Sequence, residues 1–306
     1  MSTDTRHSPL REDQAPTVGS SEAPVRETLL APTALSARRL AFRRGARERS
    51  WRVGRAALPA VILLAALIAL WQWYASQPSV DPQLLPTPVA VWTSLVAQRD
   101  ILWYHTLVTL NETLVGFAVA LVAGVLFGTA IDFSPVLRRG LYPLLVTSQT
   151  IPIITLAPLL VLWFGFGLLS KSIVVLLVCF FPITVALSDG LRASDPELIK
   201  LYRSFGANAL RIFWSVRLPG ALPSLFSGIR IAITYSVIGA IFAEYVGASA
   251  GLGFYIELQQ HSFATAGVIA AIVVTAVLSV ALFLATALIE RIALPWYYLQ
   301  DRSGGA

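Results

Sequence analysis

The sequence is poor in cysteine, histidine and charged residues, which argues against an internal disulfide, a metal site and a soluble domain, respectively. Cys179 is the only cysteine, so no disulfide can form within the chain. The three histidines are scattered without metal-ligand spacing, so we expect no metal site. Charged residues make up 13% of the chain and hydrophobic residues 56%, whereas a soluble domain has about 25% charged residues. The composition therefore indicates an integral membrane protein.

Motifs for catalysis and nucleotide binding are also lacking. Residues 247–251, GASAG, have the Gly-x-Ser-x-Gly spacing, but they lie in the loop after an expected membrane span and not at the strand-to-helix turn of a nucleophile elbow. Residues 165–172, GFGLLSKS, come within one residue of a phosphate-binding loop, but Ser170 stands where that loop needs its second glycine. We therefore expect no enzymatic activity and no cofactor. A transporter built on this chain would need an ATPase partner or an ion gradient.

The basic residues are concentrated at one end of the chain. Eleven of the 23 lysines and arginines precede residue 56, and the net charge is +6. This placement is typical of membrane orientation rather than of a nucleic-acid groove, so no nucleic-acid partner is expected. We interpret residues 1–55 as a disordered, Arg-rich cytoplasmic tail that can touch anionic membrane lipid.

Apolar runs predict an all-α membrane protein of six transmembrane helices. The expected domains are the tail, a first span with an external interfacial segment (56–105), a permease core (106–291) and a cytoplasmic C-terminal tail (292–306). The six expected spans cover residues 58–74, 106–131, 141–166, 172–187, 222–246 and 264–289.

Six spans place 21 of the 23 basic residues on one side of the membrane, with only Arg99 and Lys171 on the other. The positive-inside rule makes the richer side cytoplasmic, so both termini are expected there. The stretch 191–219 falls on the same side. It has the periodicity of an amphipathic helix, begins at Ser194 or Asp195 as a cap and is interrupted by Gly206. Periodicity alone is equally typical of a helix resting on the bilayer surface.

Polar residues within the spans are candidates for a solute pathway. Ser148, Gln149 and Thr150 precede Pro152, a helix breaker of the kind tolerated where a helix lines a cavity or packs inside a bundle. Glu112 and Glu244 lie near outer span ends, where they could be water-accessible interfacial carboxylates or belong to a gate or a substrate contact, and Glu244 is counted with the candidate pathway residues. An ion-coupled carrier acting without an ATPase is the alternative function, and a membrane anchor without transport is a third.

One spacing favours an ATP-driven importer. Gly206 is followed by nine residues and then by Val216-Arg217-Leu218-Pro219. This resembles the EAA signature of ABC-importer permeases: Glu-Ala-Ala, three residues, Gly, nine residues, Ile, one residue, Leu-Pro. APLLVLWFGFGLLSK, FFPITVALSDGLR and AEYVGASAGLGF resemble the permeases of the nitrate, sulfonate and taurine branch, which includes thiamine-pyrimidine-precursor and riboflavin-type permeases.

The resemblance implies a type I importer fold in the bacterial inner membrane, with a cytoplasmic coupling helix between the fourth and fifth spans. It also implies a homodimer, two ATP-binding-cassette ATPase subunits, and a periplasmic or lipid-anchored solute-binding protein. The ATPase-coupling residues would be Lys200, Leu201, Tyr202, Phe205, Gly206, Ala207, Leu210, Leu218 and Pro219. Two positions depart from the family: Lys200-Leu201-Tyr202 replaces Glu-Ala-Ala, and Ala186-Leu187 replaces the usual Asn-Thr before Asp-Gly.

Overall fold

The computed structural model describes residues 58–297, apart from the side chain of Ile154. Every regular element in that range is a helix, so the predicted all-α class is confirmed. The predicted N-terminal tail lies outside the described residues. The chain divides after Leu67 into two units, and the first contributes only the start of the helix Leu58–Ala75 to the described residues.

Among the described residues, five helices are long and apolar enough to cross a membrane: Leu58–Ala75, Arg99–Phe133 (α3), Leu168–Arg192 (α6), Ala209–Glu244 and Thr265–Ala293 (α11). The fourth of these consists of Ala209–Ile212 (α8), the π-helical turn Phe213–Arg217 (η1) and Leu218–Glu244 (α9). At ~1.5 Å per residue, the 35 residues of α3 reach about 52 Å. This exceeds the ~30 Å of bilayer hydrocarbon, so α3 must project beyond it.

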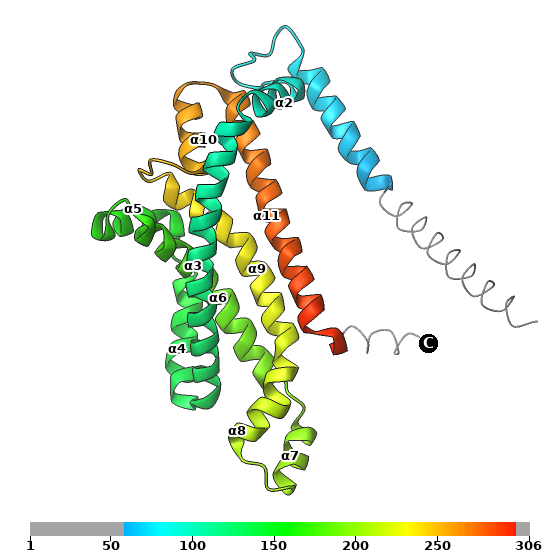
Figure 1. The fold of residues 1–306 in the computed structure, drawn as a ribbon, viewed down its shortest axis with the longest axis vertical. Coiled ribbons are helices and arrows are strands. Elements are labelled where there is room, and N and C mark those ends of the chain that lie inside the picture. Colours follow the sequence, from blue (N-terminus) through cyan, green and yellow to red (C-terminus); the bar gives the residue numbers. More distant parts are fainter. Residues whose placement is uncertain (1–57, 298–306) are drawn as a thin grey trace, which may run out of the picture. The chain divides into compact units, whose positions relative to one another are not determined.

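Helices α3 and α6 pack side by side and run in the same direction (Figure 1). Glu112 contacts Lys171, Gly124 lies against Ile183, and Gly128 lies against Leu187. In each pair the second residue follows the first by 59 positions. A Cβ on Gly124 would come within 2.7 Å of Ile183 Cγ2, so this close approach requires glycine, as the small-xxx-small pattern predicts.

Because α3 and α6 are parallel, the segment between them returns from the end of one to the start of the other. It forms two helices, Pro135–Ser148 (α4) and Ile153–Phe164 (α5). The predicted span over 141–166 is thus interrupted in this structure. Pro152 breaks it, as its fixed φ and missing N–H would lead one to expect. Neither helix alone has the length of a membrane span.

Helix α9 runs antiparallel to α6 and completes the core. Gly228 lies against Pro182, and Cys179 Sγ lies 3.2 Å from the carbonyl oxygen of Ala232. Apolar side chains from α3, α6, η1 and α9 form the main buried cluster: Ala120, Val175, Cys179, Ile183, Leu187, Leu191, Phe213, Ala221, Leu225, Ile229, Ala232 and Ala240. The core thus rests on three closely packed helices.

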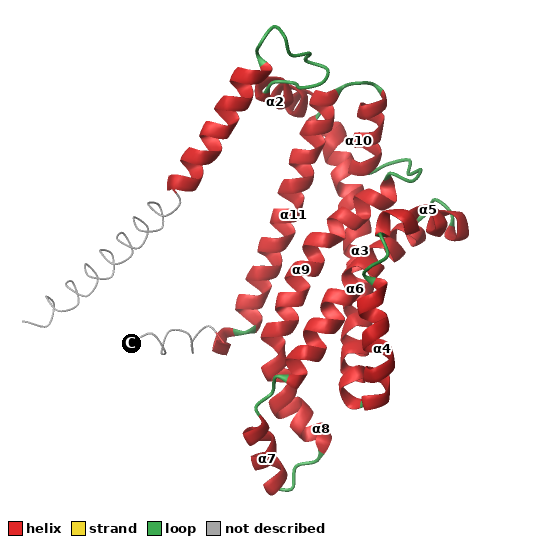
Figure 2. Ribbon diagram, turned by 180° about the vertical axis from the view of Figure 1, so that it is seen from behind, coloured by secondary structure: helices red, strands yellow, loops and turns green. Residues whose placement is uncertain are grey.

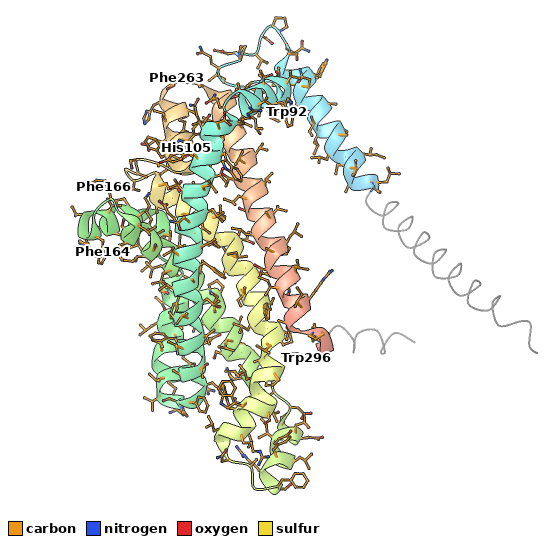
Figure 3. The ribbon with its side chains drawn as sticks, viewed as in Figure 1. Trp92, His105, Phe164, Phe166, Phe263 and Trp296 are labelled. Carbon is orange, nitrogen blue, oxygen red and sulfur yellow. The ribbon has the colours of Figure 1, made fainter. Side chains whose placement is uncertain are left out.

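Short helices lie at both ends of the long ones (Figure 2). Pro88–Ala97 (α2) and Leu252–His261 (α10) lie at what we term the α10 end, and Pro196–Ser204 (α7) lies with α8 at the α7 end. Figure 3 shows Trp92 and Phe263 near the α10 end and Trp296 toward the other. All three rings are exposed, as in the aromatic belts of membrane proteins.

Candidate functional site

The chain between α6 and α9 forms a helix–turn–helix around Gly206. Asp195 caps α7, because its Oδ1 accepts from the Glu197 N–H (2.8 Å), whereas the Ser194 hydroxyl donates to the Leu191 carbonyl. Gly206 has φ +76°, the left-handed conformation that favours glycine. The Ala207 N–H donates to Tyr202 O and the Gly206 N–H to Arg203 O, which together make a Schellman C-cap.

This turn presents apolar side chains to its surroundings. Phe205 is 80% exposed, Leu210 59%, and Trp214 61%. No residue of α7 is buried, Lys200 and Leu201 included, and Ala207 in the turn is half-buried. A hollow of about 330 Å³ is lined by Gly206, Ala207, Asn208, Leu210, Arg211 and Trp214. Exposed apolar surface of this kind is typical of a docking site. At the end of the stretch, Leu218 packs against the core and Pro219 opens α9.

A large cavity lies between α6 and α9. It measures about 600 Å³ and is lined by Gln149, Val178, Phe181, Pro182, Val185, Ala186, Asp189, Ser224, Ser227, Gly228, Ile231 and Tyr235. Of the predicted pathway residues, only Gln149 belongs to this lining. The Ser148 hydroxyl donates to Leu145 O and the Thr150 hydroxyl to Thr147 O, so both satisfy carbonyls at the end of α4. Ala186, one of the two departures from the family pattern, faces the cavity.

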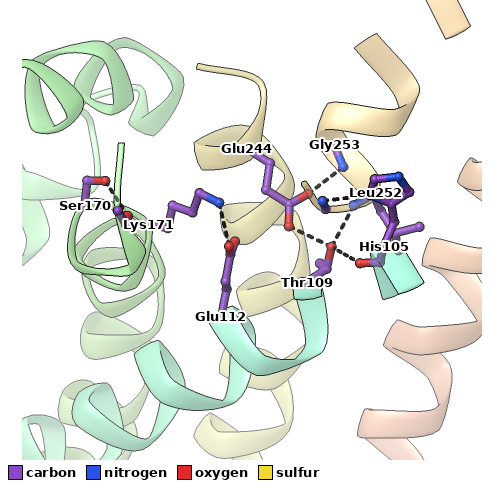
Figure 4. A network of polar contacts seen from close by, with 10 residues as sticks. His105, Thr109, Glu112, Ser170, Lys171, Glu244, Leu252 and Gly253 are labelled. Carbon is purple, nitrogen blue, oxygen red and sulfur yellow. Dashed lines mark hydrogen bonds and ion pairs between the residues drawn. The ribbon is translucent and has the colours of Figure 1, made fainter. Parts of the chain in front are cut away.

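At the α10 end, three side chains from α3, α6 and α9 form a buried ionisable group. Lys171 Nζ donates to Glu112 Oε1 at 2.5 Å, and the third member is Glu244 on α9 (Figure 4). Glu112 is 4% exposed, Lys171 7% and Glu244 0%. The interpretation of the two glutamates as water-accessible interfacial carboxylates is therefore wrong for this structure.

Glu244 is held by the first turn of α10. The Gly253 N–H donates to its Oε2 (2.5 Å), and the Thr109 hydroxyl donates to its Oε1 (2.7 Å). Next to it, the Leu252 N–H donates to Thr109 Oγ1 (2.8 Å) and the Gly251 N–H to His105 Nδ1 (3.0 Å). Three successive N–H groups that a helix start leaves unpaired are thus satisfied by side chains from other helices. A carboxylate also suits the positive end of the α10 dipole.

Sequence reasoning singled out Glu112 and Glu244 but did not connect them with each other or with Lys171. His105, Thr109 and Glu112 recur at helical spacing, which places them on one face of α3. That periodicity of polar residues inside an apolar span was the signal that could have revealed it. The partner of Glu112, Lys171, was not predictable, because the contact depends on α6 lying parallel to α3.

Comparison with known proteins agrees with this architecture. Residues 120–293 match the family described as "Binding-protein-dependent transport system inner membrane component". A probable ABC transporter permease protein of Haemophilus influenzae is 40% identical over 197 residues, which cover 64% of this chain and 80% of that one. The formylaminopyrimidine transport permease protein ThiX of Halalkalibacterium halodurans is 36% identical over 78% of this chain and 96% of its own length.

The fold is also found among solved structures. The crystal structure of an amino acid ABC transporter with histidines has a chain that superposes with a TM-score of 0.55. That match covers 65% of this chain and 97% of the other, at 16% identity. At this identity the likeness concerns the fold alone.

Proposed function

Since the chain belongs to the family of binding-protein-dependent transport system inner membrane components, and is a permease of an ABC importer, we propose that it is a six-span homodimeric subunit driven through the α7–α8 turn. The resemblance to the nitrate, sulfonate and taurine branch is confirmed. Such permeases are multi-pass membrane proteins that work with separate ATPase subunits. Two ATPases and an external binding protein are the partners we propose.

The exposed apolar turn around Gly206 is the observation that carries this proposal. Phe205, Leu210 and Trp214 would leave water if a soluble subunit docked there, and each fully buried side chain would contribute about 1.5–3 kcal/mol. The coupling residues remain those of the EAA-like stretch. Lys200 is exposed on α7, where it can pair with an acidic group of the ATPase instead of supplying the acid itself.

The sixth crossing in this proposal is the α4–α5 pair. Because α3 and α6 are parallel, the chain between them has to return across the membrane. With six crossings, both termini and the α7 end are cytoplasmic, in accord with the 21 basic residues assigned to that side. We retain the domain division at residues 55, 105 and 291.

For the solute path we propose the cavity between α6 and α9, with Gln149 at its edge. Its described lining contains the carboxylate of Asp189 and the rings of Phe181 and Tyr235, but neither lysine nor arginine. This chemistry favours an uncharged or cationic aromatic heterocycle over an anion. The relative named for formylaminopyrimidine transport supports the same class. Ser148, Thr150 and Glu244 are occupied in holding helix ends, so we leave them out of the path.

Uptake by cells that carry this chain with its ATPase and binding protein tests the proposal. We expect a labelled aminopyrimidine to accumulate at least tenfold faster than labelled taurine or nitrate. A catalytically inactive ATPase should abolish that uptake. Faster uptake of taurine or nitrate would refute the substrate class alone. Uptake driven by a proton or sodium gradient without the ATPase would establish the ion-coupled alternative, which the comparisons do not support.

A further inference from the structure

Two neighbouring residues at the end of α3 contact η1, the π-helical turn that follows α8. Asp132 pairs with Arg217 in a two-pronged arrangement, with Oδ1–Nη2 and Oδ2–Nη1 distances of 2.6 Å. The ring of Phe133 packs on that of Phe213, with centroids 5.1 Å apart. Arg217 and Phe213 lie four positions apart on η1. We call these four residues the α3–η1 clasp.

The clasp also reaches α6, and three of its four residues are largely shielded from solvent, whereas Phe133 is 49% exposed. Arg217 Nη2 donates to the carbonyl oxygen of Leu191 (3.2 Å), in the last turn of α6. The side chain of Asp132 is 3% exposed and that of Arg217 24%, while Phe213 is 5% exposed. A single guanidinium therefore joins α3, α6 and η1 at the α7 end. Of the two close contacts with Asp132, the one from Nη2 to Oδ1 is a hydrogen bond and the one from Nη1 to Oδ2 is an ion-pair contact, so the planar guanidinium is held in place at two points.

The clasp lies between the exposed turn and the buried core. η1 is a π-helical turn, in which the Leu218 N–H donates to Phe213 O, and single π-turns occur frequently at functional sites. On one side of it, α8 carries the exposed Leu210. On the other, α9 begins and packs along α6. Displacement of α8 can therefore reach α3 and α6 directly through η1, without first bending α9.

We propose that the α3–η1 clasp transmits displacement of the α7–α8 turn to α3 and α6, with Arg217 and Asp132 as positioning residues. This inference rests on the proposed function, since it requires an ATPase at the turn. Without the clasp, the turn would move with the ATPase while the cavity between α6 and α9 kept its form. ATP hydrolysis and cavity movement would then be uncoupled.

The test is Asp132→Asn combined with Arg217→Gln, purified with the ATPase subunits in lipid vesicles. The double variant removes both charges, so it leaves no unpaired buried charge of the kind that destabilises strongly. A Ser227→Cys reporter in the cavity lining is modified with an impermeant maleimide, with and without ATP and vanadate. The background is low because Cys179, the only natural cysteine, is buried. This readout needs no transported solute.

We expect ATP to change the modification rate of the reporter with the clasp intact. In the double variant that change should fall at least fivefold, while ATP hydrolysis stays within about twofold. Arg217→Lys, which keeps the charge but loses the fork, should show an intermediate loss and serves if the double variant does not fold. Arg192→Gln, which removes an exposed charge at the same end, is the matched control and should leave the change intact.

Three results would contradict the clasp. These are an undiminished rate change in the double variant, an undiminished change in Arg217→Lys, and loss of ATPase binding by a double variant with unaltered thermal stability. The last would mean that these residues shape the docking surface. If the intact chain binds no ATPase or shows no ATP-dependent change, the proposed function itself fails.

Discussion

Three ionisable side chains are buried together at the α10 end, those of Lys171, Glu112 and Glu244, and none of these residues is more than 7% exposed. Transfer of a lone charge from water to such a site costs several kcal/mol even after relaxation, and a close partner offsets that cost. Glu244 has the α10 N–H groups and Thr109, and Glu112 has Lys171. Lys171 is thus the only cation among the contacts described for the two carboxylates. Its loss therefore leaves Glu112 buried without a counter-charge.

A double-mutant cycle at this pair tests that inference. Lys171→Met leaves Glu112 buried without a counter-charge, so we expect a loss of about 3–5 kcal/mol in the free energy of unfolding. Glu112→Gln combined with Lys171→Met should lose less than Lys171→Met alone, because neither member of the pair is then a charge without its partner. Unfolding of Lys171→Met, Glu112→Gln and the double variant in mixed micelles supplies the three losses that the cycle needs. Arg99→Met, which breaks an exposed pair with Asp100, is the control and should change little. Additive losses in the cycle would contradict the assignment.

Sequence reasoning identified Glu112 and Glu244 as unusual but described their surroundings wrongly. An acidic residue near a span end is compatible with either water or a buried partner, and local composition does not separate the two. What separates them is the pairing of α3 with α6 at a separation of 59 residues, which is a long-range property. The Asp195 cap and the Gly206 turn were predictable because their hydrogen bonds are local.

At the scale of elements, the α7–α8 turn combines a fixed backbone with an unoccupied surface. Gly206 has no neighbouring atom within 4 Å of where a Cβ would stand. A Cβ there would meet no atom of the described residues, so we expect the effects of a substitution to come from backbone conformation or from a partner. The two causes can be separated, because asparagine tolerates the left-handed conformation better than other residues with a side chain.

Substitution at Gly206 therefore tests docking. We expect Gly206→Asn to retain most ATPase binding, whereas Gly206→Trp should reduce ATPase co-purification and solute uptake at least tenfold by holding the partner away. Gly220 likewise has open space where a Cβ would stand, but it lies at the start of α9, so Gly220→Trp is a matched control. Normal co-purification and uptake with Gly206→Trp would show that the ATPase docks elsewhere.

In the α4–α5 segment, by contrast, the sequence did not predict where the helices begin and end. Pro152 correctly indicated a break, yet hydropathy alone merged the helices on either side into one span. The start of α4 was missed because Ser134 and Pro135, a good cap and first residue, follow α3 without a polar loop. The presence of Gln149 in the cavity lining depends on where the two helices separate. Periodicity could not supply that position.

At the scale of the whole molecule, the parallel α3 and α6 require the chain to cross back between them. Val136 at the start of α4 and Phe166 after α5 mark the two ends of that return, and they are 80% and 68% exposed. If α4 and α5 together make the sixth crossing, cysteines at these two positions lie on opposite sides of the membrane. If both lie on the same side instead, α3 and α6 cannot both cross the membrane in the same direction, and six crossings are wrong.

Labelling with an impermeant maleimide decides between these topologies. In intact spheroplasts we expect Phe166→Cys to react at least tenfold faster than Val136→Cys, with the difference lost after permeabilisation. Leu84→Cys, 77% exposed in the segment before α2, should react like Phe166→Cys because six crossings place both outside. Unmodified protein supplies the background, since Cys179 is buried. Equal reaction at positions 136 and 166 before permeabilisation would contradict six crossings, and slow reaction at 84 with fast reaction at 136 would reverse the orientation that the basic residues predict.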